Sequence, residues 1–200
     1  MADIDYFFAT VSPYTYLAGT RLEEIAARHG ATIAYKPVDL AAVFNGTGGV
    51  LPMNRHPSRQ EYRRQELPRQ AAKLGLPFNI QPAHFPVNMA PSSYAFIAAQ
   101  RAGGGDLGGL VHAMTRSVWA DDKDLSDDAV IRACLEEAGF DPALADSGLL
   151  QGAETYVVNT EEAIQRGAFG APFYITADDQ RFWGQDRLED LDEHLGKIKT

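Results

Sequence analysis

Two short apolar runs flank one amphipathic stretch at the start of the chain. Residues 3–9 and 31–38 have the composition of buried strands. From Pro13 to Gly30 the apolar residues recur at helical spacing, and a glycine commonly ends a helix. Strand, helix and strand in this order predict a parallel pair joined by a right-handed crossover.

The middle of the chain alternates irregular segments with helical patterns. Residues 39–58 are rich in Gly, Asn and Pro and are expected to form a loop, as are the proline-rich residues 75–88. Pro68 falls within one helical pattern, where a proline is expected to kink or divide the helix. The predicted helices cover residues 58–74, 90–102, 106–120, 126–138, 142–149 and 152–166.

The C-terminal part returns to strands. Residues 169–175, a strand that begins at a proline, and 181–184 flank a turn and predict a hairpin, and a helix over 186–196 ends at Gly196. The whole order predicts an α/β protein with a thioredoxin-like fold and an inserted all-helical subdomain. The expected division is a thioredoxin-like domain at 1–40 and 152–200, with a helical insertion domain and connecting loops at 41–151.

Composition and charge exclude several classes of protein. Apolar runs are far shorter than the roughly 20 residues that span a bilayer, and the start MADIDYFF is acidic where a signal peptide is basic. We therefore expect a cytoplasmic protein with no membrane partner. The formal charge of −9 without a basic block argues against nucleic acid. The single cysteine, Cys134, excludes a Cys-x-x-Cys couple, so a reactive thiol would arrive with a ligand.

Ser12 stands where the first strand turns into a helix. Serine is a preferred N-cap and Pro13 suits the first helical position, so capping is the first explanation. The same position also offers N–H groups and a helix dipole to an anion, and a hydroxyl there would donate to a bound thiolate. The chain has no G-x-S-x-G motif, which disfavours a nucleophilic serine.

Two further motifs each have two readings. Pro172 is tolerated at the start of an edge strand, or it follows a cis bond that leaves neighbouring backbone groups free for a peptide-like ligand. Asp186 and Arg187 cap the last helix, or hold the ammonium and carboxylate of an amino-acid end group. The five histidines show no metal-ligand spacing, so no metal is expected.

Together these motifs resemble one family. Strand-Ser12-Pro13 helix, Ala171-Pro172 strand and Gly184-Gln185-Asp186-Arg187 occur in the order found in 2-hydroxychromene-2-carboxylate isomerases and kappa-class glutathione transferases, which are relatives of the disulfide oxidoreductase DsbA. The resemblance covers nearly the whole chain. It includes 57-PSRQEYRRQEL-67, 77-PFNIQPAHFPVN-88, Trp119 and 167-GAFGAPFYI-175.

The resemblance implies a glutathione-binding enzyme. Ser12 would bond the glutathione sulfur, and the main chain of Ala171, before a cis Pro172, would pair with the cysteinyl backbone. The remaining contacts implied are Asp186 with the γ-glutamyl ammonium, Gln185 and Arg187 near its carboxylate, Arg59 in place of a family lysine, and either Gly49 or Asn54 in place of a family asparagine.

The resemblance also implies a reaction and a substrate. The thiolate would add reversibly to the conjugated side chain of an opened chromene, and rotation and expulsion would give the trans-o-hydroxybenzylidenepyruvate-type isomer. The substrate, a small aromatic acid, would lie between the sheet and the helical insertion. Its predicted contacts are Phe8, Tyr14, Phe85, Pro86 and Trp119 as walls, with Asn88 or Arg59 at the carboxylate.

Three alternatives remain open. A kappa-like glutathione transferase would use the same thiolate but release a conjugate. A disulfide oxidoreductase is disfavoured because residues 12–15 contain no cysteine. A non-catalytic thioredoxin-fold module would use Ser12 only as a cap. By resemblance we expect a homodimer.

Overall fold

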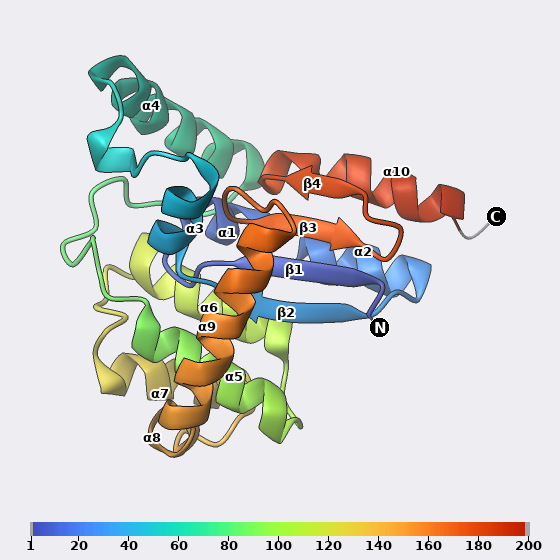
Figure 1. Ribbon diagram of the computed structural model, residues 1–200. Helices are drawn as coiled ribbons and strands as arrows, with labels where there is room; N and C mark the ends of the chain where they lie inside the picture. The colour runs from blue at the N-terminus through green and yellow to red at the C-terminus, as the bar shows by residue number, and fades with distance from the viewer. Residues whose placement is uncertain (1, 199–200) are drawn as a thin grey trace.

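The computed structural model describes residues 2–198, which fold around a four-stranded mixed sheet (Figure 1). The strand order is β2-β1-β3-β4, with β1 parallel to β2 and antiparallel to β3, and with β3 antiparallel to β4. This arrangement confirms the predicted parallel pair and C-terminal hairpin. The strands are β1 (Ile4–Phe8), β2 (Ile33–Pro37), β3 (Phe173–Thr176) and β4 (Arg181–Trp183).

Helices separate and follow these strands. In Figure 1, α9 crosses the face of the sheet turned to the viewer, α2 lies behind it, and α5, α7 and α8 lie below. Two 3₁₀ helices cover Pro52–Asn54 and Gln185–Arg187. The α-helices are α1 (Pro13–Ala18), α2 (Arg21–His29), α3 (Leu40–Thr47), α4 (Pro57–Leu74), α5 (Ala90–Ala102), α6 (Leu107–Trp119), α7 (Asp128–Glu137), α8 (Leu144–Ser147), α9 (Leu149–Gln165) and α10 (Leu188–Ile198).

Alternation along β1 divides the core between the two faces of the sheet. Tyr6 and Phe8 join the larger cluster with residues of α2, α5, α6 and α10, whereas Phe7 joins a second cluster with α3 and α9. Phe96 of α5 lies edge-on to Phe8, with ring centroids 5.0 Å apart. The inserted helices therefore complete the core beneath the sheet. The predicted thioredoxin-like fold with a helical insertion is confirmed, while the division at residues 40 and 152 stays a prediction.

The expectation of a loop over residues 39–58 was wrong in part. The Asp39 side chain caps α3 by accepting from the backbone N–H groups of Ala41 at 2.9 Å and Ala42 at 3.2 Å. Val43 and Phe44 are buried, so the helix has an apolar face that glycines around it obscured in the sequence. Residues of α3 form one wall of the candidate site.

Two predicted helix boundaries also require correction, and a division of α4 at Pro68 is excluded. The stretch from Pro13 to Gly30 is two helices, because Gly19 adopts a φ of 59° that breaks the first one. Pro68 lies inside α4 without dividing it. The last helix continues past Gly196 to Ile198.

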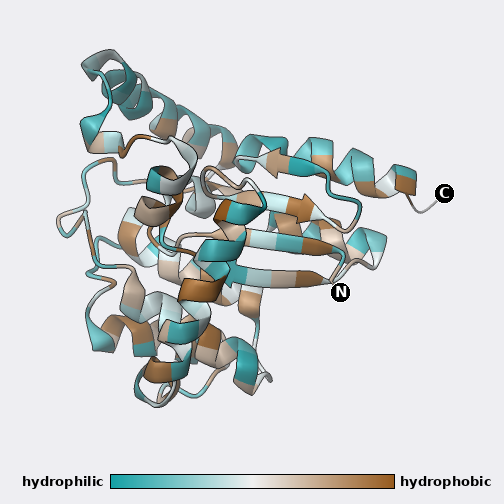
Figure 2. Ribbon diagram, viewed as in Figure 1, coloured by the Kyte–Doolittle hydropathy of each residue, from teal (hydrophilic) through white to brown (hydrophobic). Residues whose placement is uncertain are grey.

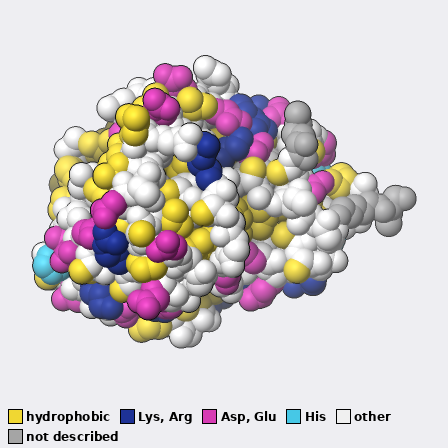
Figure 3. Space-filling view, turned by 90° about the horizontal axis from the view of Figure 1, so that it is seen from below, with side chains coloured by type: hydrophobic (Ala, Val, Ile, Leu, Met, Phe, Trp, Pro, Cys, Tyr) yellow, Lys and Arg dark blue, Asp and Glu magenta, His cyan; other side chains and the backbone are white. Residues whose placement is uncertain are grey.

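Hydrophilic residues predominate along α4 (Figure 2), whereas the lower face of the molecule is mixed (Figure 3). Figure 2 shows α4 as hydrophilic along most of its length, and Figure 3 shows acidic, basic and apolar side chains interspersed on the lower face. No helix within residues 2–198 has both the length and the apolar composition that crossing a bilayer requires.

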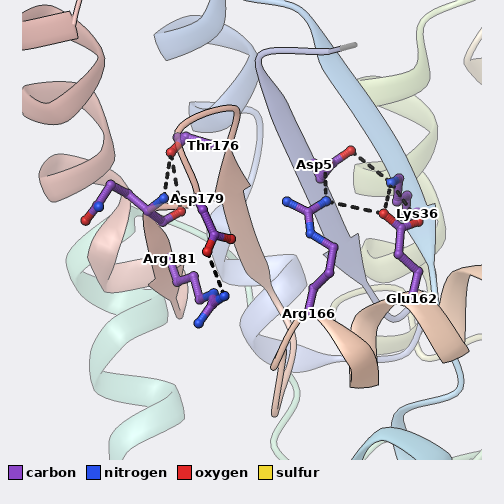
Figure 4. A network of polar contacts seen from close by, with 8 residues as sticks. Asp5, Lys36, Glu162, Arg166, Thr176, Asp179 and Arg181 are labelled. Carbon is purple, nitrogen blue, oxygen red and sulfur yellow. Dashed lines mark hydrogen bonds and ion pairs between the residues drawn. The ribbon is translucent and has the colours of Figure 1, made fainter.

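One polar network ties α9 to β1 and β2 (Figure 4). The Lys36 Nζ lies 2.9 Å from an Asp5 oxygen and 2.6 Å from a Glu162 oxygen. Arg166 contacts the same two carboxylates. Burial opposes ionisation of Asp5, but the hydrogen bonds and charges of Arg166 and Lys36 hold its pKa below the ordinary value.

The network predicts a stability that depends on acid. A carboxyl whose pKa is lower in the folded chain stabilises the fold above about pH 4, and that contribution is lost as the pH falls further. Asp5→Asn should cost about 1–3 kcal/mol at pH 7. It should also flatten the dependence of the unfolding free energy on pH between roughly pH 5 and 2, as measured by urea denaturation.

A matched control is Asp179→Asn on the β3–β4 turn. The ion pair of Asp179 with Arg181, at 2.9 Å, is exposed. The unfolding free energy of the Asp179→Asn variant should therefore depend on pH as that of wild type does. An Asp5→Asn profile parallel to wild type would contradict the assignment.

Candidate functional site

A cavity of about 650 Å³ opens where the start of α1 meets the turn before β3. Its size falls in the range of small-molecule sites, and its lining is mainly apolar with a few polar groups. Its lining comprises Val11, Ser12, Pro13, Tyr14, Leu40, Ala41, Phe44, Leu51, Pro52, Met53, Arg55, Gln60, Arg63, Arg64, Glu66, Phe85, Pro86, Val87, Met89, Gly170, Ala171, Trp183, Gly184 and Asp186.

Ser12 both caps α1 and borders the cavity. Its Oγ accepts from the Thr15 N–H at 3.3 Å and donates to the Ala171 carbonyl oxygen at 3.3 Å. Its side chain is buried, with 4% of the residue exposed. The distance to Ala171 exceeds the usual 2.7–2.8 Å of such bonds, so this hydroxyl proton is only weakly engaged.

The segment before β3 has the predicted backbone geometry. The Ala171–Pro172 peptide bond is cis, and the Pro172 carbonyl accepts from the Gly184 N–H at 3.0 Å. Ala171 thereby faces Ser12 across one corner of the cavity. A second cis bond, Phe85–Pro86, lies in the segment before α5, also at the cavity, and was not foreseen in the sequence.

The motif at residues 184–187 is divided between the cavity and its surroundings. Asp186 lines the cavity, and Arg187 pairs with it at 3.3 Å without lining the cavity itself. Gln185 is buried and its Oε1 accepts from Arg21 at 2.7 Å. Gln185 therefore supports the turn that carries Asp186 and does not reach the cavity.

Of the predicted walls, Tyr14, Phe85 and Pro86 line the cavity, whereas the others lie elsewhere. Phe8 and Trp119 are core residues, with 0% and 1% of their surface exposed. Trp119 donates from its Nε1 to the Val11 carbonyl at 3.1 Å, beneath the cavity wall. The Asn88 Oδ1 accepts from the Ala90 N–H at 3.1 Å, so Asn88 organises the start of α5.

Arg59, predicted as a ligand contact, is exposed on α4 and does not line the cavity. Helical geometry gives the reason, since Leu67 marks the buried side of α4. Arg59 precedes Leu67 by eight residues, about 80° around the helix, while Arg63 precedes it by four, about 40°. Extending the buried stripe of α4 one turn toward its start would have identified Arg63 instead.

The residues missed in the sequence come mainly from α3, the following 3₁₀ helix and α4. Phe44, Met53, Arg55 and Arg63 all line the cavity. The glycine-rich segment concealed α3, so nothing in the hydrophobic pattern placed Phe44 beside Ser12.

The cavity brings both signs of charge together around a neutral phenol. The Tyr14 hydroxyl donates to the Glu66 Oε2 at 2.8 Å, and burial, then this bond, raises the pKa of Tyr14. Burial lowers the pKa of both Arg55 and Arg63, although each guanidinium stays charged. The cavity therefore offers a weakly held hydroxyl, an acid at Asp186, and arginines from α4 and from the segment just before it. This set fits a small ligand that carries an ammonium and more than one carboxylate.

Fold and cavity define the class of protein. Residues 3–196 match the DSBA-like thioredoxin domain family. The cytosolic disulfide reductase DsbM from Pseudomonas aeruginosa, solved with GSH, shares the fold with a TM-score of 0.67 at 14% identity, over 98% of this chain and 96% of that chain.

More similar relatives narrow the class. A 2-hydroxychromene-2-carboxylate isomerase from Sphingobium xenophagum is 34% identical over 197 residues, covering 96% of this chain and 97% of the relative. One from Pseudomonas putida is 29% identical over 198 residues, covering 98% and 95%. A solved 2-hydroxychromene-2-carboxylate isomerase has a TM-score of 0.77 at 29% identity, over 98% of this chain and 95% of that chain. The chain belongs to the 2-hydroxychromene-2-carboxylate isomerase family, which confirms the resemblance and the enzyme class, isomerase.

Proposed function

We propose that this chain is a glutathione-dependent isomerase that converts 2-hydroxychromene-2-carboxylate-type aromatic acids to trans-o-hydroxybenzylidenepyruvate-type products. The observation that carries the proposal is the contact between the Ser12 Oγ and the Ala171 carbonyl, at 3.3 Å in the cavity wall. This contact connects the N-terminus of α1, which would stabilise a thiolate, with the backbone at Ala171, which would pair with a peptide-like ligand. Family membership supports the reaction and the substrate class.

The lining fits glutathione, which carries one ammonium, two carboxylates and one thiol. Asp186 would take the ammonium, and the main chain of Ala171 before Pro172 would pair with the cysteinyl unit. Arg187 would support Asp186 through their ion pair. When bound, glutathione supplies a thiolate that adds reversibly to the conjugated side chain of the substrate.

Ser12 acts by stabilising negative charge on sulfur. A free thiol has a pKa near 8.5, so half ionisation at neutral pH requires about 2 kcal/mol. A hydrogen bond to a charged group supplies about 1.5–3 kcal/mol. Because α1 has only six residues, we assign its dipole the low end of the usual range, about 0.3 kcal/mol. The Ser12 hydroxyl therefore supplies most of the stabilisation, and its weak bond to Ala171 leaves its proton available.

The aromatic part of the substrate would lie on the apolar side of the cavity. Phe85, Pro86 and Phe44 supply that surface, and Tyr14 contributes its ring. The phenol of Tyr14 stays protonated because burial and Glu66 raise its pKa, so it is not the base of the reaction.

The alternatives differ in what happens to the thiol. A transferase would consume glutathione, and a binding module would give no turnover. A disulfide oxidoreductase is disfavoured further because burial raises the pKa of Cys134, the sole cysteine, to about 11. A cytoplasmic location and a homodimer stay predictions.

An assay of turnover separates these alternatives. With 2-hydroxychromene-2-carboxylate as substrate, product absorbance should rise only when glutathione is present. Thiol titration after many turnovers should recover all of the glutathione. Stoichiometric loss of thiol would instead identify a transferase, and no product at any glutathione concentration would refute the proposed function.

Asp186→Asn should weaken glutathione binding on the order of 10- to 100-fold, because the variant loses a charged hydrogen bond to the γ-glutamyl ammonium. Calorimetry should show no such loss for the dipeptide cysteinylglycine, which lacks the γ-glutamyl unit. The matched control is Asp190→Asn, since Asp190 also contacts Arg187 but does not line the cavity. Equal losses for both ligands would refute the role of Asp186.

A further inference from the structure

Arg63 is a half-buried cation that faces the cavity without an acidic partner. Across residues 2–198 its guanidinium forms no ion pair, and its described contact is with the Trp119 ring, 6.0 Å from the centroid. Glu66, one turn further along α4, accepts from Tyr14 and attracts Arg63 by its charge, but it forms no ion pair with Arg63. A buried charge without a partner is costly, which points to an anionic group supplied by a ligand.

Arg55 adds a second positive charge to the same region. Its Nε donates to the Val50 carbonyl at 2.9 Å, and its guanidinium lies 5.6 Å from the Phe44 ring centroid. Burial first, and then repulsion from Arg55, lowers the pKa of Arg63. Arg64 differs from both, because it is exposed and pairs with Glu61 at 3.3 Å. Of the three arginines that line the cavity, Arg55 and Arg63 form no ion pair within residues 2–198, and an anion between them would relieve their repulsion.

The aromatic side of the cavity adjoins this pair of cations. Arg63 lies over Trp119, and Phe85 packs against the same indole with ring centroids 4.9 Å apart. Both Phe85 and Arg63 line the cavity. When the ring of a ligand packs on Phe85, the guanidinium of Arg63 therefore lies in the same part of the site and is available to a carboxylate of that ligand.

We propose that Arg63, assisted by Arg55, binds the carboxylate of the aromatic acid while Phe85 and Pro86 contact its ring. The identity of the acid rests on the proposed function, but the pairing of an aromatic surface with a guanidinium rests on the geometry of the cavity. The assignment replaces Arg59 and Asn88, which lie outside the cavity lining. Planar, bidentate contact with a carboxylate suits arginine better than lysine.

Binding of two probes that differ only in charge tests the proposal. Calorimetry at pH 7 would compare trans-cinnamate with its neutral amide, cinnamamide. Wild type should bind cinnamate on the order of 10- to 100-fold more tightly than the amide. Arg63→Gln should bring this ratio close to one, and Arg63→Lys should retain part of it.

Arg69→Gln is the matched control. Arg69 is exposed on the same helix, does not line the cavity, and loses the same charge on substitution, so its ratio should equal that of wild type. Circular dichroism would verify that Arg63→Gln is folded, and Arg63→Lys gives a second readout with the charge retained.

Three results would overturn the proposal. The ratio could be near one in wild type, it could survive in Arg63→Gln, or Arg63→Gln could weaken glutathione as much as cinnamate, which would assign the arginine to glutathione. These measurements need no turnover. A protein that discriminates the probes through Arg63 but shows no isomerase activity would therefore refute the proposed function and leave this site intact.

Discussion

The hydrogen bond between Ser12 and Ala171 joins parts of the chain that are 159 residues apart. It exists because β1 and β3 are antiparallel neighbours in the sheet, so the last residue of β1 and the first residue of β3 lie at the same end of the sheet. Every helix of the insertion lies between β1 and β3 in sequence. The insertion must therefore fold without separating these two strands. The pairing of β1 with β3 is thus the constraint on which the cavity depends.

The cavity combines a sheet side and a helical side with different chemistry. The sheet side supplies backbone groups, a hydroxyl and the carboxylate of Asp186, all suited to a peptide-like thiol. The helical side supplies an apolar surface and arginines from α4, suited to an aromatic acid. The chain carries a net charge of −9, yet α4 places positive charge at the cavity, where it favours anionic ligands.

Local signals in the sequence were sufficient for the sheet and for the placement of Ser12, Ala171 and Asp186 at the cavity, but not for Gln185 and Arg187, which lie outside its lining. Ser12 before Pro13 caps α1, as the local sequence predicted, and the Ala171–Pro172 bond is cis, as the family resemblance implied. The helical side was less predictable, because which face of α4 points inward depends on how Leu67 packs in the tertiary structure. Phe8 and Trp119 were predicted as walls of the substrate site, but large apolar rings are equally suited to the core, and both lie there.

The central claim is that the Ser12 hydroxyl stabilises a thiolate, and an ultraviolet pH titration of bound glutathione tests it most directly. In wild type the thiolate absorbance should appear well below the free-thiol pKa of about 8.5, and Ser12→Ala should raise the midpoint by roughly 1–2 pH units. Ser147→Ala, at an exposed serine of α8, should leave the midpoint unchanged. A bound thiol that titrates like free glutathione in wild type, or a midpoint unaffected by Ser12→Ala, would contradict the account and leave Ser12 as a helix cap.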